Sequence, residues 1–289
     1  MHDLLIAPFT EFGFLRRALI GCLALSVSAP VLGVFLVLRR MSLTADVLAH
    51  GALPGVALAF LLAGFSAPLL WAGGLVAGLL VAVGAGALSR ATGGREDATL
   101  AALYLLALGL GVALISMGGG GGADVTHILF GSVLGVDDPA LLLMAGVATV
   151  TLAVLAFAWR PLVLECFDPA FAAATGAHGG AWHMVFQALV VVNVLSAFQA
   201  LGTLMAVGLM MLPAIAARHW ARQVSGMAYA AVGMAVIASV AGLLLSYHAD
   251  VPTGPAIVLI AGGIWAVSVL AGPVDGLLAR LFRRRHLAG

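Results

Sequence analysis

Charged side chains are scarce in this sequence, and lysine is absent from it altogether. Only 9% of the 289 residues are Asp, Glu, Lys or Arg, whereas 63% are hydrophobic. Soluble domains carry about a quarter charged residues, so the composition excludes an ordinary water-soluble fold. The 13 arginines and 12 acidic residues leave a net charge of +1. There is no basic, aromatic-rich stretch for nucleic acid, and no nucleic-acid partner is expected.

Cysteine and the common catalytic motifs are also rare or missing. Cys22 lies in an apolar run and Cys166 in what reads as a polar loop, which predicts two free thiols rather than a disulfide. The sequence has no Walker-type phosphate loop, no Ser/His/Asp triad and no hydrophilic stretch long enough for a soluble domain. We therefore expect no enzyme and no permanently bound cofactor, and any ATP hydrolysis would reside on a separate subunit.

Most of the sequence consists of long apolar runs without charged residues. Runs of about 17 to 22 residues can cross a hydrocarbon core of about 30 Å, and within it only helices satisfy every backbone group. The sequence thus predicts an all-α fold, a polytopic membrane bundle of eight or nine transmembrane helices in a single domain, residues 1–289. The expected segments are 18–38, 45–64, 66–88, 99–117, 139–159, 181–200, 201–217, 227–247 and 255–274. The count depends on whether Gly202 breaks the stretch 181–217.

The arginines predict the orientation, because basic residues collect on the cytoplasmic side of membrane proteins. The clusters are Arg39-Arg40, Arg90 with Arg95, Arg160, Arg218 with Arg222, and Arg280 to Arg285. If Gly202 divides 181–217, two segments separate each cluster from the next, and all of them face the cytoplasm. Arg16 and Arg17 then lie on the opposite side, which conflicts with the rule.

Asp46 and His50 are the only ionisable side chains between Arg40 and Arg90. Residues four apart share one helix face, so both can reach a single ion. Ionisable residues within a membrane segment usually mark a transport path, and a carboxylate with an imidazole suits zinc or manganese, with iron possible. Ser42 or Thr44 is a candidate helix cap. The following Pro54-Gly55 predicts a broken helix, as transporters have at binding sites.

Simpler interpretations of the pair stay open. Asp46 can be a helix-start residue near the headgroups, and His50 an interhelical hydrogen-bonding histidine. One pair also supplies only two of the four ligands that zinc usually takes. A homodimer with the pair facing its axis would supply four, and this is the hypothesis that we carry forward.

A second candidate stretch runs from Glu165 to Gly176. Asp168 is a favourable N-cap, Pro169 suits the first helical turn and Gly176 can end the helix. These signals predict a short helix on the cytoplasmic side, either an interfacial connector or a docking element for an ATPase. The residues assigned to ATPase coupling are Glu165, Phe167, Asp168, Pro169, Phe171 and Gly176.

Polar residues that share a face, Asn193, Ser196 and Gln199, are expected to make hydrogen bonds between helices, with lining of the path as the minority interpretation. The single histidines near segment ends are not expected to be metal ligands; they are His127, His178, His183, His219 and His248. His248 with Asp250 is the better candidate among them, as a weak outer site or a contact with a delivery protein.

Several motifs together resemble the permease family of bacterial zinc, manganese and iron ABC importers, over residues 16–273. The most specific is Arg39-Arg40-Met41-Ser42-Leu43 followed by Asp46, His50 and Leu53-Pro54-Gly55. The others, in the family's order, are Phe130–Gly135, Phe167-Asp168-Pro169, Gly202-Thr203-Leu204 with Leu212-Pro213-Ala214, and Thr253-Gly254-Pro255.

The resemblance implies a homodimeric permease in the bacterial inner membrane, in contact with membrane lipid. It also implies two cytoplasmic ATP-binding subunits and an extracytoplasmic metal-binding protein as partners. Asp46 and His50 would contact the transported metal, and the stretch from Phe167 to Gly176 would be the ATPase-coupling helix. Ala170 stands where relatives often have an acidic residue, so specific salt bridges to the ATPase are not expected there.

An ion-coupled secondary metal carrier is the alternative function, because it would share the hydropathy and the buried pair. A channel is a third possibility, although a broken helix favours a carrier. An intramembrane enzyme is the least favoured, because no nucleophile or second acidic group accompanies the pair.

Overall fold

The computed structural model describes residues 12–64, 66–117, 136–168, 171 and 179–282, and the regular structure in these ranges is entirely helical. The helices are α3 (Gly13–Leu38), α4 (Thr44–Gly51), α5 (Leu53–Ala63), α6 (Ala67–Thr92), α7 (Glu96–Met117), α9 (Asp138–Phe167), α11 (Gly179–Leu201), α12 (Thr203–Ala217), α13 (Val224–Ala249), α14 (Thr253–Ala271) and α15 (Leu277–Phe282). The expected all-α membrane bundle is therefore confirmed.

Eight of the described helical segments are long and apolar enough to cross a membrane, with α4 and α5 counted as one span, Thr44–Ala63. The remaining predicted segment, 201–217, corresponds to α12, which has only 15 residues. Gly202 separates it from α11 with a φ of 86°, a conformation that residues with a Cβ rarely adopt. The break predicted at Gly202 is thus confirmed.

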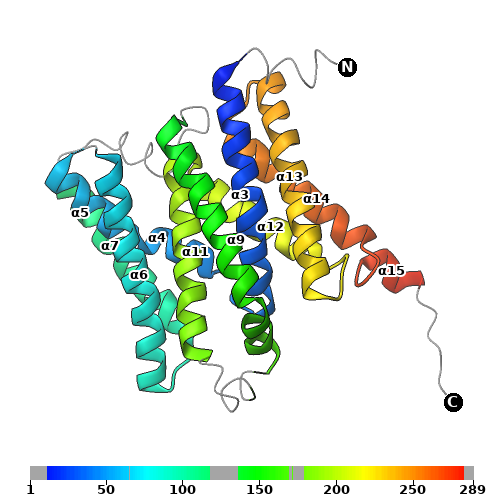
Figure 1. Cartoon of the computed structure of the whole chain (residues 1–289), viewed down its shortest axis with the longest axis horizontal. Coiled ribbons are helices and arrows are strands. Elements are labelled where there is room, and N and C mark those ends of the chain that lie inside the picture. The colour runs from blue at the N-terminus through cyan, green and yellow to red at the C-terminus, as the bar shows by residue number, and fades with distance from the viewer. Residues whose placement is uncertain (1–11, 65, 118–135, 169–170, 172–178, 283–289) are drawn as a thin grey trace.

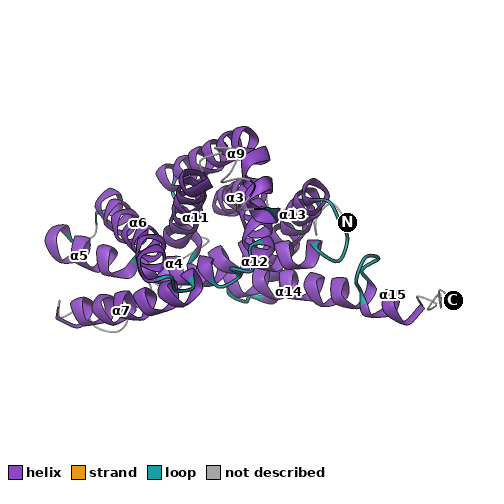
Figure 2. Cartoon of the chain, turned by 90° about the horizontal axis from the view of Figure 1, so that it is seen from below, coloured by secondary structure: helices purple, strands orange, loops and turns teal. Residues whose placement is uncertain are grey.

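The long helix α3 occupies the centre of the bundle (Figure 1) and packs against α9, α12 and α13. Helices α5, α6 and α7 form a group of their own at one end of the molecule, and α4 and α11 join this group to the rest. Viewed along the helices, α7, α4, α12 and α14 lie in a row along one side (Figure 2), and successive members of this row contact each other.

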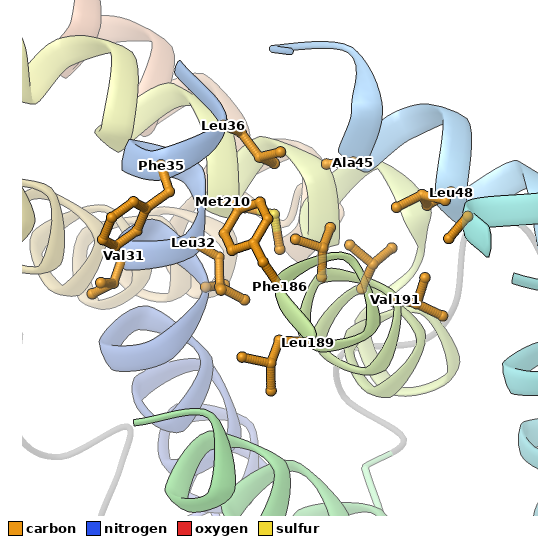
Figure 3. Close-up of a cluster of buried hydrophobic side chains, with 14 of the residues drawn as sticks. Val31, Leu32, Phe35, Leu36, Ala45, Leu48, Phe186, Leu189, Val191 and Met210 are labelled. Carbon is orange, nitrogen blue, oxygen red and sulfur yellow. The ribbon is translucent and has the colours of Figure 1, made fainter. Parts of the chain in front are cut away.

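The main hydrophobic core lies where α3, α4, α9, α11 and α12 meet (Figure 3). Phe35 of α3 is fully buried, and its ring packs edge-on against Trp159 at 5.3 Å and against Phe186 at 6.1 Å between centroids. Ala45 and Leu48 of α4 belong to the same core. One face of the short helix α4 is therefore held firmly by apolar packing.

Buried polar side chains connect the helices within this core. Asn193 of α11 accepts a hydrogen bond from the Ser28 hydroxyl (3.0 Å) and donates one to the Thr151 hydroxyl (2.6 Å). These bonds tie α11 to α3 and α9, which confirms the interhelical role expected for Asn193. Ser196 instead bonds to the backbone of its own helix, and the side chain of Gln199 lies outside the described residues.

Arg17, which conflicted with the charge rule, has an acidic partner. Its guanidinium lies 3.3 Å from a carboxylate oxygen of Asp138, so that α3 and α9 are bridged at this end. Pairing lowers the cost of an arginine at the end that the charge rule assigns to the extracytoplasmic side. The expected state of both thiols is confirmed, but the loop predicted around Cys166 is wrong, because α9 continues through Pro161 to Phe167.

Candidate functional site

The turn between α3 and α4 fixes the position of the candidate metal pair. The N–H of Met41 donates to the carbonyl of Leu36, and that of Arg40 to the carbonyl of Val37, which is the Schellman pattern that ends many helices. Arg40 takes the left-handed position of this motif, with a φ of 60°, where glycine is more usual. The chain reverses sharply here, and α4 begins within a few residues.

Asp46 and His50 lie one helical turn apart on α4, as the spacing predicts. The Nε2 atom of His50 is 3.5 Å from Oδ1 of Asp46. Thr44, Ala45, Leu48 and Ala49, on the opposite face of α4, are buried. The side chains of Asp46 and His50 remain 48% and 23% exposed in the single chain. The pair thus points away from the core of its own chain.

The helix breaks where the sequence indicates, with one correction. Helix α4 ends at Gly51 and α5 starts at Leu53, so the break falls just ahead of Pro54. Proline has no N–H for the carbonyl four residues earlier, here that of His50. The expected cap is wrong: Leu43 occupies the N-cap position without a side-chain bond, and the buried Thr44 hydroxyl has no partner among the described residues.

The described part of one chain places only two candidate ligands together. Among the described residues, no group of three or more His, Cys, Asp and Glu side chains is suitably placed for an ion. The pair has an aromatic neighbour, since the Tyr104 ring of α7 lies 5.9 Å from the His50 ring. Asp46 and His50 can therefore contribute two ligands, and further ligands must come from outside this part of the chain.

The residues assigned to ATPase coupling fall into two environments. Phe167 is 66% and Phe171 54% exposed at the end of α9 and beyond it. The backbone N–H of Phe171 donates to the Asp168 carboxylate at 2.9 Å, as expected of an N-cap. Pro169 and Gly176 lie outside the described residues, so the length of the predicted helix is not tested.

Glu165 lies inside the bundle, apart from those exposed side chains. Its carboxylate accepts a hydrogen bond from the Arg39 guanidinium at 3.0 Å, and the side chain is only 15% exposed. Its assignment to coupling stays a prediction, and a direct contact with another subunit would require this ion pair to open.

The sequence analysis missed the side chains that surround Glu165. His183 contacts both Arg39 and Glu96, and Gln187 also bonds to Glu96. No local pattern joins residues that stand 87 to 144 positions apart. The available signal was the i, i+4 spacing of His183 and Gln187 near the start of an apolar segment.

Comparison with known proteins places this geometry in context. The profile of the ABC 3 transport family matches residues 11–272. A manganese transport system membrane protein (MntC) of Halalkalibacterium halodurans is 31% identical, over 96% of this chain and 93% of its own length. A probable iron transport system membrane protein of Haemophilus influenzae is 29% identical, over 93% and 97%.

A solved structure shows the same fold. The structure of PsaBC from Streptococcus pneumoniae in complex with Fab has a chain that superposes with a TM-score of 0.83 at 30% sequence identity. The match covers 95% of this chain and 98% of that one. The likeness thus extends over nearly the whole chain.

Proposed function

The chain belongs to the ABC 3 transport family, and from this premise we propose that residues 1–289 form one permease unit that imports a divalent metal by alternating access. It is a multi-pass bacterial membrane protein, expected in the inner membrane. ATP hydrolysis would take place on a separate cytoplasmic subunit. An extracytoplasmic binding protein would deliver the metal.

The observation that carries this proposal is the position of Asp46 and His50. The two side chains lie 3.5 Å apart on one face of a helix that breaks just after them. They remain partly exposed although the opposite face of the helix is buried. An ionisable pair on an open helix face at membrane depth needs a polar partner, and a passing metal ion with its water would provide one.

A second copy of the chain would complete the ligand set. Helix α4 lies within the row α7, α4, α12, α14 along one side of the bundle (Figure 2). If two copies met through this row about a two-fold axis, each would contribute an aspartate and a histidine. The resulting two carboxylates and two imidazoles would make up the four ligands of a closed site, of which Asp46 and His50 of one chain supply two.

Manganese is our first choice of cargo. Carboxylate and imidazole ligands accept manganese, zinc and iron, so the donor set alone does not select among the three. Relatives are named for manganese or for iron transport. We therefore rank manganese ahead of iron and zinc. Membership in an ABC transport family also disfavours the secondary carrier as the alternative.

The exposed Phe167 and Phe171 are the proposed contact with the ATPase, together with the Asp168 cap. Aromatic side chains are enriched at the centres of protein interfaces. Both phenylalanines stand at the end of α9 that the arginine rule assigns to the cytoplasm. An ATPase subunit would reach this end without entering the membrane.

Uptake into proteoliposomes tests the function. The permease, its ATPase and its binding protein should take up 54Mn only when ATP is present, and competition by zinc and iron would rank the metals. Asp46→Asn should lower uptake at least tenfold at unchanged abundance, whereas Asp138→Asn, at an exposed site, should not. ATP-independent uptake by the permease alone, driven by an ion gradient, would replace the importer with a secondary carrier.

Disulfide trapping tests the dimer separately. Leu43 at the start of α4 is 69% exposed, so Leu43→Cys in a Cys166→Ser background should cross-link two copies. Absence of any cross-link at Leu43 and at the other exposed α4 positions would count against the shared site.

A further inference from the structure

A cluster of interacting polar side chains lies at the cytoplasmic end of the bundle, where four helices meet. We call it the Arg39 cluster, and its members are Arg39 (end of α3), Glu96 (start of α7), Glu165 (end of α9), and His183 and Gln187 (α11). Arg39 and Glu165 are 8% and 15% exposed at their side chains. The Glu96 side chain is 26% exposed, so the shielded charges of Arg39 and Glu165 depend on each other and on His183 for partners.

The hydrogen bonds of the cluster have a defined direction. A guanidinium only donates, so Arg39 donates to Nδ1 of His183 at 2.8 Å as well as to Glu165 at 3.0 Å. His183 is then left with a proton on Nε2, which donates to Glu96 at 2.7 Å. Gln187 donates to the same oxygen of Glu96 at 2.6 Å. The chain of bonds thus runs from Glu165 through Arg39 and His183 to Glu96.

The surroundings hold this chain of bonds in place. The Arg39 guanidinium lies over the Phe186 ring, 4.6 Å from its centroid, where cation–π attraction adds to the hold. The head groups of Glu96 and Arg90 both lie beside Gly86. A Cβ added to Gly86 would be 3.6 Å from the Glu96 carboxylate and 3.3 Å from the Arg90 guanidinium. Burying charges is costly, and apolar side chains of similar volume often stabilise a helix contact at least as much as a buried ion pair does. Stability alone therefore does not account for the cluster.

Each end of the cluster leads to a different candidate functional element. Glu165 precedes Phe167 and Asp168, at the start of the proposed ATPase contact, by two and three residues. Arg39 lies at the turn from α3 into α4, which carries Asp46 and His50. Glu96 begins α7, and Tyr104, about 12 Å further along that helix at 1.5 Å per residue, contacts His50.

We propose that the Arg39 cluster is a positioning unit that transmits movement of the ATPase-docking end of α9 to the metal pair. It does so along two routes, from Glu165 through Arg39 to α4 and through His183 and Glu96 to α7. Helix α4, which carries His50, and α7, whose Tyr104 contacts His50, would move together when α9 is displaced. The proposal rests on the proposed function, since it presupposes an ATPase and a transported metal.

The experiment measures coupling in the complete transporter reconstituted in proteoliposomes. Glu165→Gln retains the shape of the side chain and removes its charge, which weakens the bond to Arg39. The ratio of 54Mn transported to ATP hydrolysed should fall at least tenfold, while the ATPase rate stays within twofold. Mn²⁺ binding to the purified permease, measured by electron paramagnetic resonance, should be unchanged.

A matched control exists on the same two helices. Arg17 and Asp138 join α3 to α9 at the opposite end, also as an arginine and a carboxylate. Asp138→Asn should leave the transport ratio unchanged, because that end lies away from the ATPase.

Glu96→Gln tests the second route and should uncouple like Glu165→Gln, since it weakens the bond between His183 and α7.

The outcomes separate this proposal from the proposed function. If the wild-type complex fails to transport Mn²⁺ with ATP, the proposed function is wrong and the positioning role is lost with it. If the wild type transports but both variants keep its transport ratio, only the positioning role is overturned. Transport and hydrolysis that fall in proportion, with a lower melting temperature, would mean that the cluster only stabilises the fold, which also overturns the proposal.

Discussion

The contact of α5 with α6 allows a sharp test of how this bundle is packed. Gly55 and Gly73 face each other so closely that a Cβ on Gly55 would overlap the carbonyl oxygen of Gly73. The same Cβ would lie 2.6 Å from the carbonyl carbon of Gly73 and 2.7 Å from Cβ of Ala77, where ordinary contacts begin at 3.4 Å. Gly55→Ala therefore forces α5 and α6 apart by more than 1 Å, because the overlap with the carbonyl oxygen has to be relieved first.

The expected cost follows from two opposing effects. Overpacking of a tight contact typically costs about 1–3 kcal/mol, and backbone atoms on α6 have no rotamer through which to relax. Alanine in place of glycine in a helix interior stabilises the helix by about 1 kcal/mol, which offsets part of this cost. We expect Gly55→Ala to lower the free energy of unfolding by about 1–2 kcal/mol. Because α5 is nearly continuous with α4, metal uptake should fall as well.

Unfolding of the purified protein in mixed micelles of increasing SDS content, followed by circular dichroism, measures this cost. Gly109→Ala on α7 is the matched control, since nothing lies within 4 Å of the position of its Cβ. The control should equal or exceed the wild type in stability. Equal stability of Gly55→Ala and Gly109→Ala would refute the close approach of α5 and α6.

Three further predictions concern other parts of the bundle. Asn193→Leu should cost about 1–2 kcal/mol in the same unfolding assay, because it removes two interhelical hydrogen bonds worth about 0.6 kcal/mol each in membranes and takes from the buried Thr151 hydroxyl its Asn193 partner. No loss of stability would contradict the buried network. Phe167→Ala should reduce co-purification of the ATPase subunit at least fivefold. Phe157 is also exposed but lies nearer the middle of α9, so Phe157→Ala should have no such effect. Equal effects of the two variants would remove Phe167 from the interface. Arg17→Gln should cost less than about 0.5 kcal/mol, because surface ion pairs contribute little, and a larger loss on thermal unfolding would show that this pair is effectively buried.

Much of the fold could be predicted from the sequence because membrane helices are specified locally. A run of apolar residues contains its own hydrogen-bond partners, and each predicted segment has its helix in the structure. The Asp46 and His50 pair was predictable for the same reason, since one helical turn brings them together. The break at Gly202 was also local, because its positive φ favours glycine.

The Arg39 cluster could not be predicted in this way. Its members come from four helices, and their proximity depends on how α3, α9 and α11 pack. Glu165 illustrates the difference. Glu165 was predicted to be a docking residue because it stands just before Phe167 and Asp168 in the sequence. In the structure its side chain turns into the bundle toward Arg39. The side chains of Phe167 and Asp168, two and three residues later, are exposed instead.

The adjacent arginines at the end of α3 show why composition predicts the side of the membrane but not the interior of the bundle. Hydropathy and the charge rule treat Arg39 and Arg40 alike, and the rule assigns both to the cytoplasmic end. Arg40 is itself the left-handed residue of the Schellman motif, at which the chain turns. Arg39 precedes the turn and reaches back into the bundle, and Arg40 is left exposed. Exchanging the two roles would require a different backbone, so the turn, and not the charge, decides which arginine joins the cluster.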